Sequence, residues 1–323
     1  MSRARIPVLA VAVLLPLLVL AALVVRPVPA DPTDAPVVLV ADPIVAGGLL
    51  DVLESDGDRT LEVLTGTTIE SARQLVEDGI VIAAVRVDLE SASDVLYVAG
   101  ANGSQVNDPV VTAITDLLDT FDRDVAVLDV HPADVPVATP GILVGTGLVL
   151  GVVLMLVRQW GARVRRGARP PRHLAERIGT DALLYGVTLG LAAVALGLPG
   201  SPPLWIVLGT AVVVAAATIT ATAVRTIGPW GLGVVAALFL LPIWVLVRAP
   251  HPLLLPAGFE AVGQWMPHGA AAEITQRMAL FGDAASTRPW IVLLGWAVAG
   301  ALALALTRRA APTEPAEPAA IEG

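Results

Sequence analysis

The residue types most suited to chemistry gather in one polar stretch, residues 258–286, between two long apolar runs near the C-terminal end. His268 and Glu273 supply a base and an acid there. They could form an acid–base pair, or His268 could be a solvated histidine at the start of a helix. Glu273 also precedes Arg277 by one helical turn, which allows an ion pair along the helix. The sequence shows no nucleophilic triad, paired carboxylates or metal-ligand cluster, so we expect this chain not to be an enzyme.

The same stretch has the spacing of an amphipathic helix over residues 269–281. Ile274, Met278 and Phe281 recur on one face of that helix. We therefore expect the helix to lie in the outer membrane interface, or to re-enter the membrane there, with its apolar face toward lipid. The residues assigned to this outer-interface segment are Pro256, Trp265, Pro267, His268, Glu273, Arg277 and Phe281.

A glycine-rich run at residues 145–151 resembles a phosphate-binding loop. It lies inside an apolar segment and contains no lysine, so a nucleotide site is a poor interpretation. Gly147 and Gly151 are four residues apart, as are Gly186 and Gly190. Small residues at this spacing let helix backbones approach closely, which predicts helix packing.

Two polar motifs each allow two interpretations. Thr218, Thr220 and Thr222 could line a polar path through a membrane helix, or they could bond the carbonyls of their own helix. The Asn102-Gly-Ser sequence fits a glycosylation acceptor, and it fits a tight loop equally well.

Composition limits the remaining chemistry. The chain has no cysteine and only four histidines, which are scattered, so neither a disulfide framework nor a metal site is expected. With 323 residues, 55% of them hydrophobic and 15% charged, it is too apolar for a soluble domain of this length. All 20 basic residues are arginine, which suggests a genomic base-composition bias. We expect a multi-pass protein of a bacterial plasma membrane, with an actinobacterial-like composition.

The arginine-rich stretch from Arg158 to Arg177 orders the rest of the chain. It holds seven arginines and one acid between two apolar runs, and positive charge beside a membrane span stays on the cytoplasmic side. Because its neighbours are of bilayer length, a nucleic-acid patch is a poor interpretation and no nucleic-acid partner is expected. Membrane lipid is the expected surrounding partner.

Six apolar runs have the length of membrane spans, and arginine marks each predicted cytoplasmic end. The first run is also compatible with a signal peptide cleaved before Asp31. With that run uncleaved, both termini lie in the cytoplasm. The six runs are residues 7–25, 140–157, 182–198, 204–223, 230–247 and 289–306.

Residues 31–138 have the composition of a water-soluble domain. Apolar, β-branched runs predict strands at residues 37–41, 61–65, 80–87, 95–99 and 125–130. Between them, helical spacing covers residues 44–54, 69–78 and 106–121. Thr67 or Thr68 could cap the second helix, Gly79 suits its end, and Pro109 could stand at the start of the third. Residues 26–138 hold 21 acids and five arginines, a formal charge of −16, so we place this domain outside the cytoplasm.

The predicted fold is an all-α polytopic membrane bundle of six transmembrane helices with both termini inside. A small α/β extracytoplasmic domain is inserted between the first two helices. The chain divides into the first helix (1–30), the α/β domain (31–138), the membrane domain with helices two to six (139–309) and a disordered cytoplasmic tail (310–323).

In this order of elements the chain resembles permeases of the ABC-2 type, in particular the YhgE/Pip-like branch. Two stretches carry the resemblance: residues 70–91, a helix, a strand and a polar turn, and residues 255–300. In the second stretch the positions that match the family pattern are Pro256, Pro267, Gly269, Arg277 and Phe281.

The resemblance implies a homodimer and a separate ATPase subunit, so that ATP is used only by that subunit and this chain binds no cofactor itself. The loop between the second and third spans lacks the family's "E..GTLE.L" docking segment, although residues 174–178 could form a short coupling helix. The residues assigned to ATPase contact are Arg165, Arg166, Arg169, Leu174 and Arg177.

The expected function is therefore that of a membrane permease subunit of an ABC-2-like exporter. Its cargo would be a hydrophobic or amphipathic molecule, or a component of the cell envelope. The alternative is a non-transporting scaffold whose acidic domain binds an envelope or secretion partner.

Overall fold

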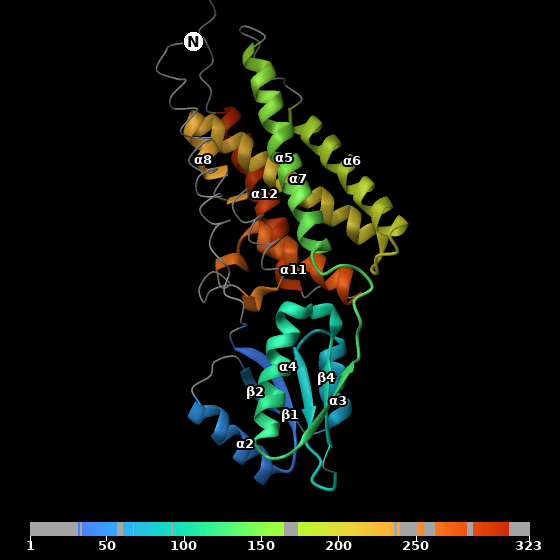
Figure 1. Cartoon of the computed structure of the whole chain (residues 1–323). Helices are drawn as coiled ribbons and strands as arrows, with labels where there is room; N and C mark the ends of the chain where they lie inside the picture. Colours follow the sequence, from blue (N-terminus) through green and yellow to red (C-terminus); the bar gives the residue numbers. More distant parts are fainter. Residues whose placement is uncertain are drawn as a thin grey trace, which may run out of the picture.

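The computed structural model describes residues 32, 34–56, 61–66, 68–91, 93–164, 174–235, 238–239, 251–254, 262–282 and 287–309. Figure 1 shows an α/β domain at one end of a helical bundle, with α11 (Pro267–Leu280) lying between them. The order of strands and helices along the domain follows the predicted order. The described part of the chain therefore combines mostly helical structure with one five-stranded sheet.

The sheet of the α/β domain has the order β2-β1-β3-β4-β5, in which β3 and β4 run antiparallel and the other neighbours run parallel. β-Branched and aliphatic residues favour these strands, and at the centre of the sheet both faces are covered. The strands are β1 (Ala35–Val40), β2 (Leu61–Thr65), β3 (Ala83–Arg86), β4 (Ser93–Val98) and β5 (Asp124–Asp129).

Alternate residues of the three central strands, β1, β3 and β4, enter two separate cores. Val37 and Val85 pack in the cluster beneath α2 (Pro43–Asp56) and α4 (Ser104–Asp119). Val38 and Ala84 pack on the opposite face, against α3 (Ile69–Glu77). The domain is thus a three-layer sandwich, and the alternation follows from the two-residue period of a strand.

Local signals explain where the helices of the domain begin and end. Thr68 caps α3, because its hydroxyl oxygen accepts a hydrogen bond of 3.3 Å from the backbone N–H of Ser71. Gly79 follows α3 with a φ of +63°, as predicted for a helix stop. Thr67 lies outside the described residues.

The predicted start of the third helix at Pro109 is wrong, because α4 begins at Ser104 and contains Pro109. Gly103, with a φ of +84°, turns the chain into the helix five residues earlier than expected. Asn102 is only 2% exposed and is the last residue of a short 3-10 helix, η1 (Gly100–Asn102). Asn102 is therefore part of a tight loop and is not accessible to a glycan in the folded domain.

Four helices of the bundle are long and apolar enough to cross a membrane. They correspond to the second, third, fourth and sixth predicted spans. The first predicted span lies outside the described residues, and of the fifth the structure describes little beyond its start, with η2 (Gly228–Trp230) and α8 (Gly231–Val235). The four helices are α5 (Thr139–Val164), α6 (Leu174–Ala195), α7 (Pro202–Thr226) and α12 (Thr287–Arg309).

Helix α7 is the centre of the bundle, because 67% of its most apolar segment is buried, whereas 28% of the corresponding segment of α12 is buried. The glycine pairs face it. A Cβ added at Gly190 would lie 2.7 Å from the side chain of Ile206, and one added at Gly151 would lie 2.8 Å from Ala216. Both glycine pairs thus pack against α7 of the same chain, as close helix approach requires.

The threonines of α7 bond their own helix. The hydroxyl of Thr218 donates to the carbonyl of Val214 at 2.7 Å, and that of Thr220 donates to the carbonyl of Ala216 at 2.6 Å. Thr222 is half-buried and its hydroxyl has no hydrogen-bond partner among the described residues. Of the two interpretations, helix self-bonding holds for Thr218 and Thr220.

Candidate functional site

Helix α11 joins the bundle to the α/β domain. Met266 adopts the extended conformation of a helix cap and Pro267, which is buried, stands in the first turn. Ile274 and Met278 are completely buried in the core shared with Trp205 of α7. The predicted contact of this apolar face with lipid is wrong, because protein side chains of the bundle cover it.

The C-terminal end of α11 bears on the domain through polar contacts. The Nε2 of His131 lies 2.8 Å from the carbonyl oxygen of Leu280, and its ring stacks on Phe281 with the centroids 5.2 Å apart. Arg277 donates a long hydrogen bond of 3.5 Å to the carbonyl oxygen of Asp78. We call this set of five residues the α11 junction.

An apolar contact completes the α11 junction. Phe281 packs on the cluster between α3 and the sheet, which includes Val76 and Ala99. A Cβ added at Gly79 would lie 2.7 Å from the Phe281 ring, so a side chain at position 79 would clash with the ring in this position. The ring is therefore held by the domain while the preceding helix is held by the bundle.

At its other end α11 is tied to α12. The guanidinium of Arg288 donates to Glu273 Oε2 at 3.1 Å and to Gln264 Oε1 at 2.9 Å. The indole N–H of Trp296 donates to the carbonyl oxygen of Trp265, whose own ring is exposed, at 2.8 Å. The predicted Glu273–Arg277 pair is replaced by this inter-helix pair, since Arg277 reaches the domain instead.

His268 and Glu273 do not form the acid–base pair that their chemistry allowed. Glu273 is engaged by Arg288, and His268 is largely buried with no hydrogen-bond partner for its Nδ1 among the described residues. Burial lowers the pKa of His268 to about 4, against the weaker opposing effect of a backbone hydrogen bond with Leu238. His268 is therefore a buried neutral ring at the start of the helix, and Glu273 does not orient it.

We expect the bundle to lose stability as the pH falls from about 6.5 to about 4, because unfolded His268 takes up a proton that folded His268 resists. Above pH 6.5 the ring is neutral in both states and this effect vanishes. The full effect is on the order of 3 kcal/mol. Thermal unfolding of the full chain at several pH values, compared with His268→Gln, measures it. Identical pH profiles for the two proteins would contradict the assignment, since the carboxylates contribute equally to both.

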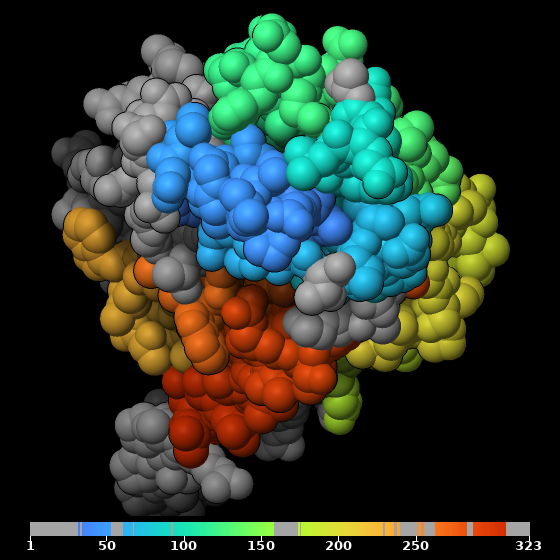
Figure 2. All heavy atoms as spheres, turned by 90° about the horizontal axis from the view of Figure 1, so that it is seen from below, coloured from blue at the N-terminus to red at the C-terminus, as the bar shows by residue number. Residues whose placement is uncertain are grey.

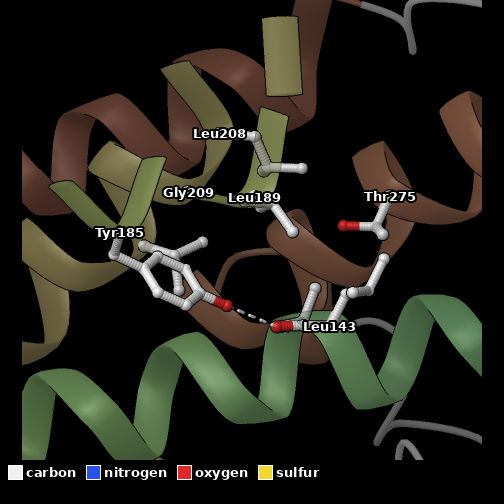
Figure 3. A pocket seen from close by; sticks show the side chains of 8 residues that line it. Leu143, Tyr185, Leu189, Leu208, Gly209 and Thr275 are labelled. Carbon is white, nitrogen blue, oxygen red and sulfur yellow. Dashed lines mark hydrogen bonds between the residues drawn. The ribbon is translucent and has the colours of Figure 1, made fainter. Parts of the chain in front are cut away.

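Figure 3 shows a pocket where α5, α6, α7 and α11 meet. The hydroxyl of Tyr185 donates to the carbonyl oxygen of Leu143 at 3.1 Å, and Thr275 of α11 lies on the opposite side. The cavity volume is about 10 Å³, which holds one water molecule at most. The pocket is therefore a packing feature that fixes α11 against the bundle.

The residues predicted to contact an ATPase are only partly described. Arg165, Arg166 and Arg169 lie outside the described residues. Arg177 is exposed, whereas Leu174 is buried in a cluster with Met155 and Leu304. The separate coupling helix expected at residues 174–178 is wrong, because these residues are the first turns of α6.

One acidic residue was not assigned to a span by the sequence. Asp181 lies inside the apolar part of α6, which starts at Glu176 rather than at the predicted Ala182. It lines a small pocket with Met155, Ile178 and Val213. The earlier start of this helix could have been predicted from Leu174 and Ile178. Their spacing of four residues continues the apolar face of the third predicted span toward the arginine-rich stretch.

Comparison with protein-family models, with curated proteins and with solved structures gives no match. Among the described residues, no group of three histidine, aspartate or glutamate side chains could hold a metal ion. The α11 junction is thus the candidate functional site on geometry alone, because α11 is packed in the bundle core while its C-terminal end contacts the domain.

Proposed function

We propose that the protein is the membrane subunit of an ABC-2-like exporter that moves a hydrophobic or amphipathic molecule, or a cell-envelope component, outward across a bacterial plasma membrane. In this proposal the chain has six spans with both termini inside and the α/β domain outside. It works as a homodimer, with ATP hydrolysed by a separate subunit.

The observation that carries the proposal is the double attachment of α11. Its Ile274 and Met278 are fixed in the bundle core, while Phe281 and the carbonyl of Leu280 are held by the domain. Interiors of this kind transmit small shifts rather than absorb them, because close-packed cores deform little. In this proposal a rearrangement of the bundle during transport therefore moves the domain.

The homodimer of this proposal rests on the resemblance to ABC-2 permeases. The two small hollows described between the bundle helices have cavity volumes of about 10 Å³ each, so neither is a cargo site in this conformation.

Co-purification in a mild detergent tests the proposal. Tagged protein taken from its own membranes should bring down a stoichiometric soluble ATPase, identified by mass spectrometry. Replacing Arg165, Arg166 and Arg169 together by serine should remove that ATPase, whereas serine at Arg308 and Arg309, at another predicted cytoplasmic end, should not. Absence of an ATPase across several detergents would overturn the ATP-driven part of the proposal.

One observation favours the alternative of a partner-binding scaffold. Strand β5 is at the edge of the sheet, and its Val127 and Leu128 are both about half exposed. Edge strands of this kind can accept a further strand from another protein. If no ATPase is found while the protein captures one specific envelope partner, and replacing Val127 by lysine abolishes that capture, the scaffold function replaces transport.

A further inference from the structure

The α/β domain contains an apolar cavity on the sheet face covered by α2 and α4. All its lining side chains are apolar and come from two layers, the sheet and the helices on this face: Val37 and Leu39 of β1, Leu61 and Val63 of β2, Leu49 of α2 and Ile114 of α4 are among them. The enclosed cavity volume is about 20 Å³, which is smaller than an alkyl chain, so the cavity must widen to admit one. A space with this lining favours apolar groups over water.

Helix α2 covers the cavity loosely. Among its residues 43–52, only Ala46 and Leu49 are buried, and Gly47 and Gly48 have open space where a side chain would stand. Ile44 is 86% exposed although it is aliphatic. Figure 2 looks onto this end of the domain and shows the blue atoms of α2 at the surface. Two adjacent glycines and so few anchors make α2 the part of the covering layer that moves at least cost.

The cavity belongs to an apolar core that reaches the membrane side of the domain. The same cluster includes Leu254, which is buried and belongs to η4 (Pro252–Leu254), a segment placed between the fifth span and α11. Leu253 packs against the cluster as well. Apolar contact is thus continuous from the bundle side of the domain to the cavity under α2.

We propose that this cavity binds the apolar chain of a neutral or cationic amphiphile, and that α2 moves outward to admit it. The lining selects an alkyl chain because no polar group faces the cavity. The formal charge of −16 over residues 26–138 disfavours an anionic headgroup near its mouth. The inference rests on the proposed transport function only in naming this ligand as cargo; binding itself can be measured without transport.

The test is photolabelling of the full chain in phosphatidylcholine nanodiscs with a dodecylamine that carries a diazirine at the end of its chain. Peptide mass spectrometry should place the label on β2 and α4. Dodecylamine and dodecanol should compete with the probe, and dodecanoate should compete about tenfold more weakly because of the acidic surface. Label confined to the bundle helices would overturn the proposal.

Two variants of one residue separate cavity binding from a folding defect. Val63→Phe fills the cavity and Val63→Thr keeps its volume but adds a hydroxyl, so each should reduce labelling of β2 and α4 about fivefold. Leu64→Phe is the matched control, since Leu64 pairs with Val38 on the opposite face of the sheet and should label normally. Unchanged labelling in both Val63 variants would refute the site.

Alanine at Gly47 and Gly48 tests the movement of α2. Neither position has an atom within 4 Å of the added Cβ, so the change stiffens the helix without a clash. Labelling should slow severalfold, and an unchanged rate would overturn the role of α2. If the cavity is labelled but no ATPase is found, ligand binding is supported and the ATP-driven transport function is refuted. If an ATPase is found but the cavity is not labelled, only ligand binding in the cavity is refuted.

Discussion

Replacing Arg123 by alanine should destabilise the α/β domain by about 3–5 kcal/mol, because the change leaves a buried carboxylate without its partner. The guanidinium of Arg123 forms two bonds to Asp94, at 2.6 and 2.7 Å, and Asp94 has no exposed surface. Only 16% of the Arg123 side chain is exposed. The hydrogen bond to Asp94 raises the pKa of Arg123 above its ordinary value.

Arg123 also holds two backbone segments together, which enlarges the expected effect. It donates to the carbonyl oxygens of Asp88 and Ser91, at 2.6 and 2.9 Å, in the turn between β3 and β4. Asp94 Oδ1 accepts from the backbone N–H of Asp88 at 3.1 Å. Loss of the guanidinium thus leaves the Asp94 carboxylate without its charged partner and removes a donor from each carbonyl; that of Asp88 keeps the backbone N–H of Ser91, at 3.2 Å.

Hydrogen exchange of the β3 and β4 amides in the full chain measures this loss. The matched control is Arg73→Ala, because Arg73 pairs with Glu77 at 2.8 Å on the exposed face of α3 and should change stability by less than about 0.5 kcal/mol. A combined Arg123→Met and Asp94→Leu variant should recover much of the loss, since it removes both charges. Equal protection in Arg123→Ala and Arg73→Ala would show that the buried pair does not stabilise the domain.

The strands and helices of the domain could be predicted because their signals are local. β-Branched runs, the cap at Thr68 and the glycine at position 79 act within a few residues. The Asp94–Arg123 pair joins positions 29 residues apart, and no periodicity of the sequence encodes that distance. Its two residues therefore looked like ordinary surface charges.

The contacts of the candidate site could not be predicted from local sequence either. Helical spacing at Ile274 and Met278 identified an apolar face, but spacing does not say whether lipid or protein covers it. The partner of Leu280 is His131, 149 residues away. Hydropathy also placed the start of the third span at Ala182, because Glu176 and Arg177 in the first turns of α6 resemble a loop.

Replacing Phe281 by alanine should weaken the attachment of the domain to α11 by about 2–3 kcal/mol, because the ring packs against the domain core. The chain has no cysteine, so spin labels can be attached at Glu70→Cys on the domain and Ser201→Cys on the bundle. The distance distribution between the labels should broaden in Phe281→Ala. Phe121→Ala is the control, since Phe121 is an exposed phenylalanine of the same domain.

A double-mutant cycle with His131→Ala locates the effect at the α11 junction. The stacked rings should give a coupling energy of about 1 kcal/mol, because each variant removes the same ring contact. An unchanged distance distribution in Phe281→Ala would show that the domain is held elsewhere. If the distribution broadens and export of an identified cargo continues at the normal rate, the junction is structural and α11 does not couple the domain to transport.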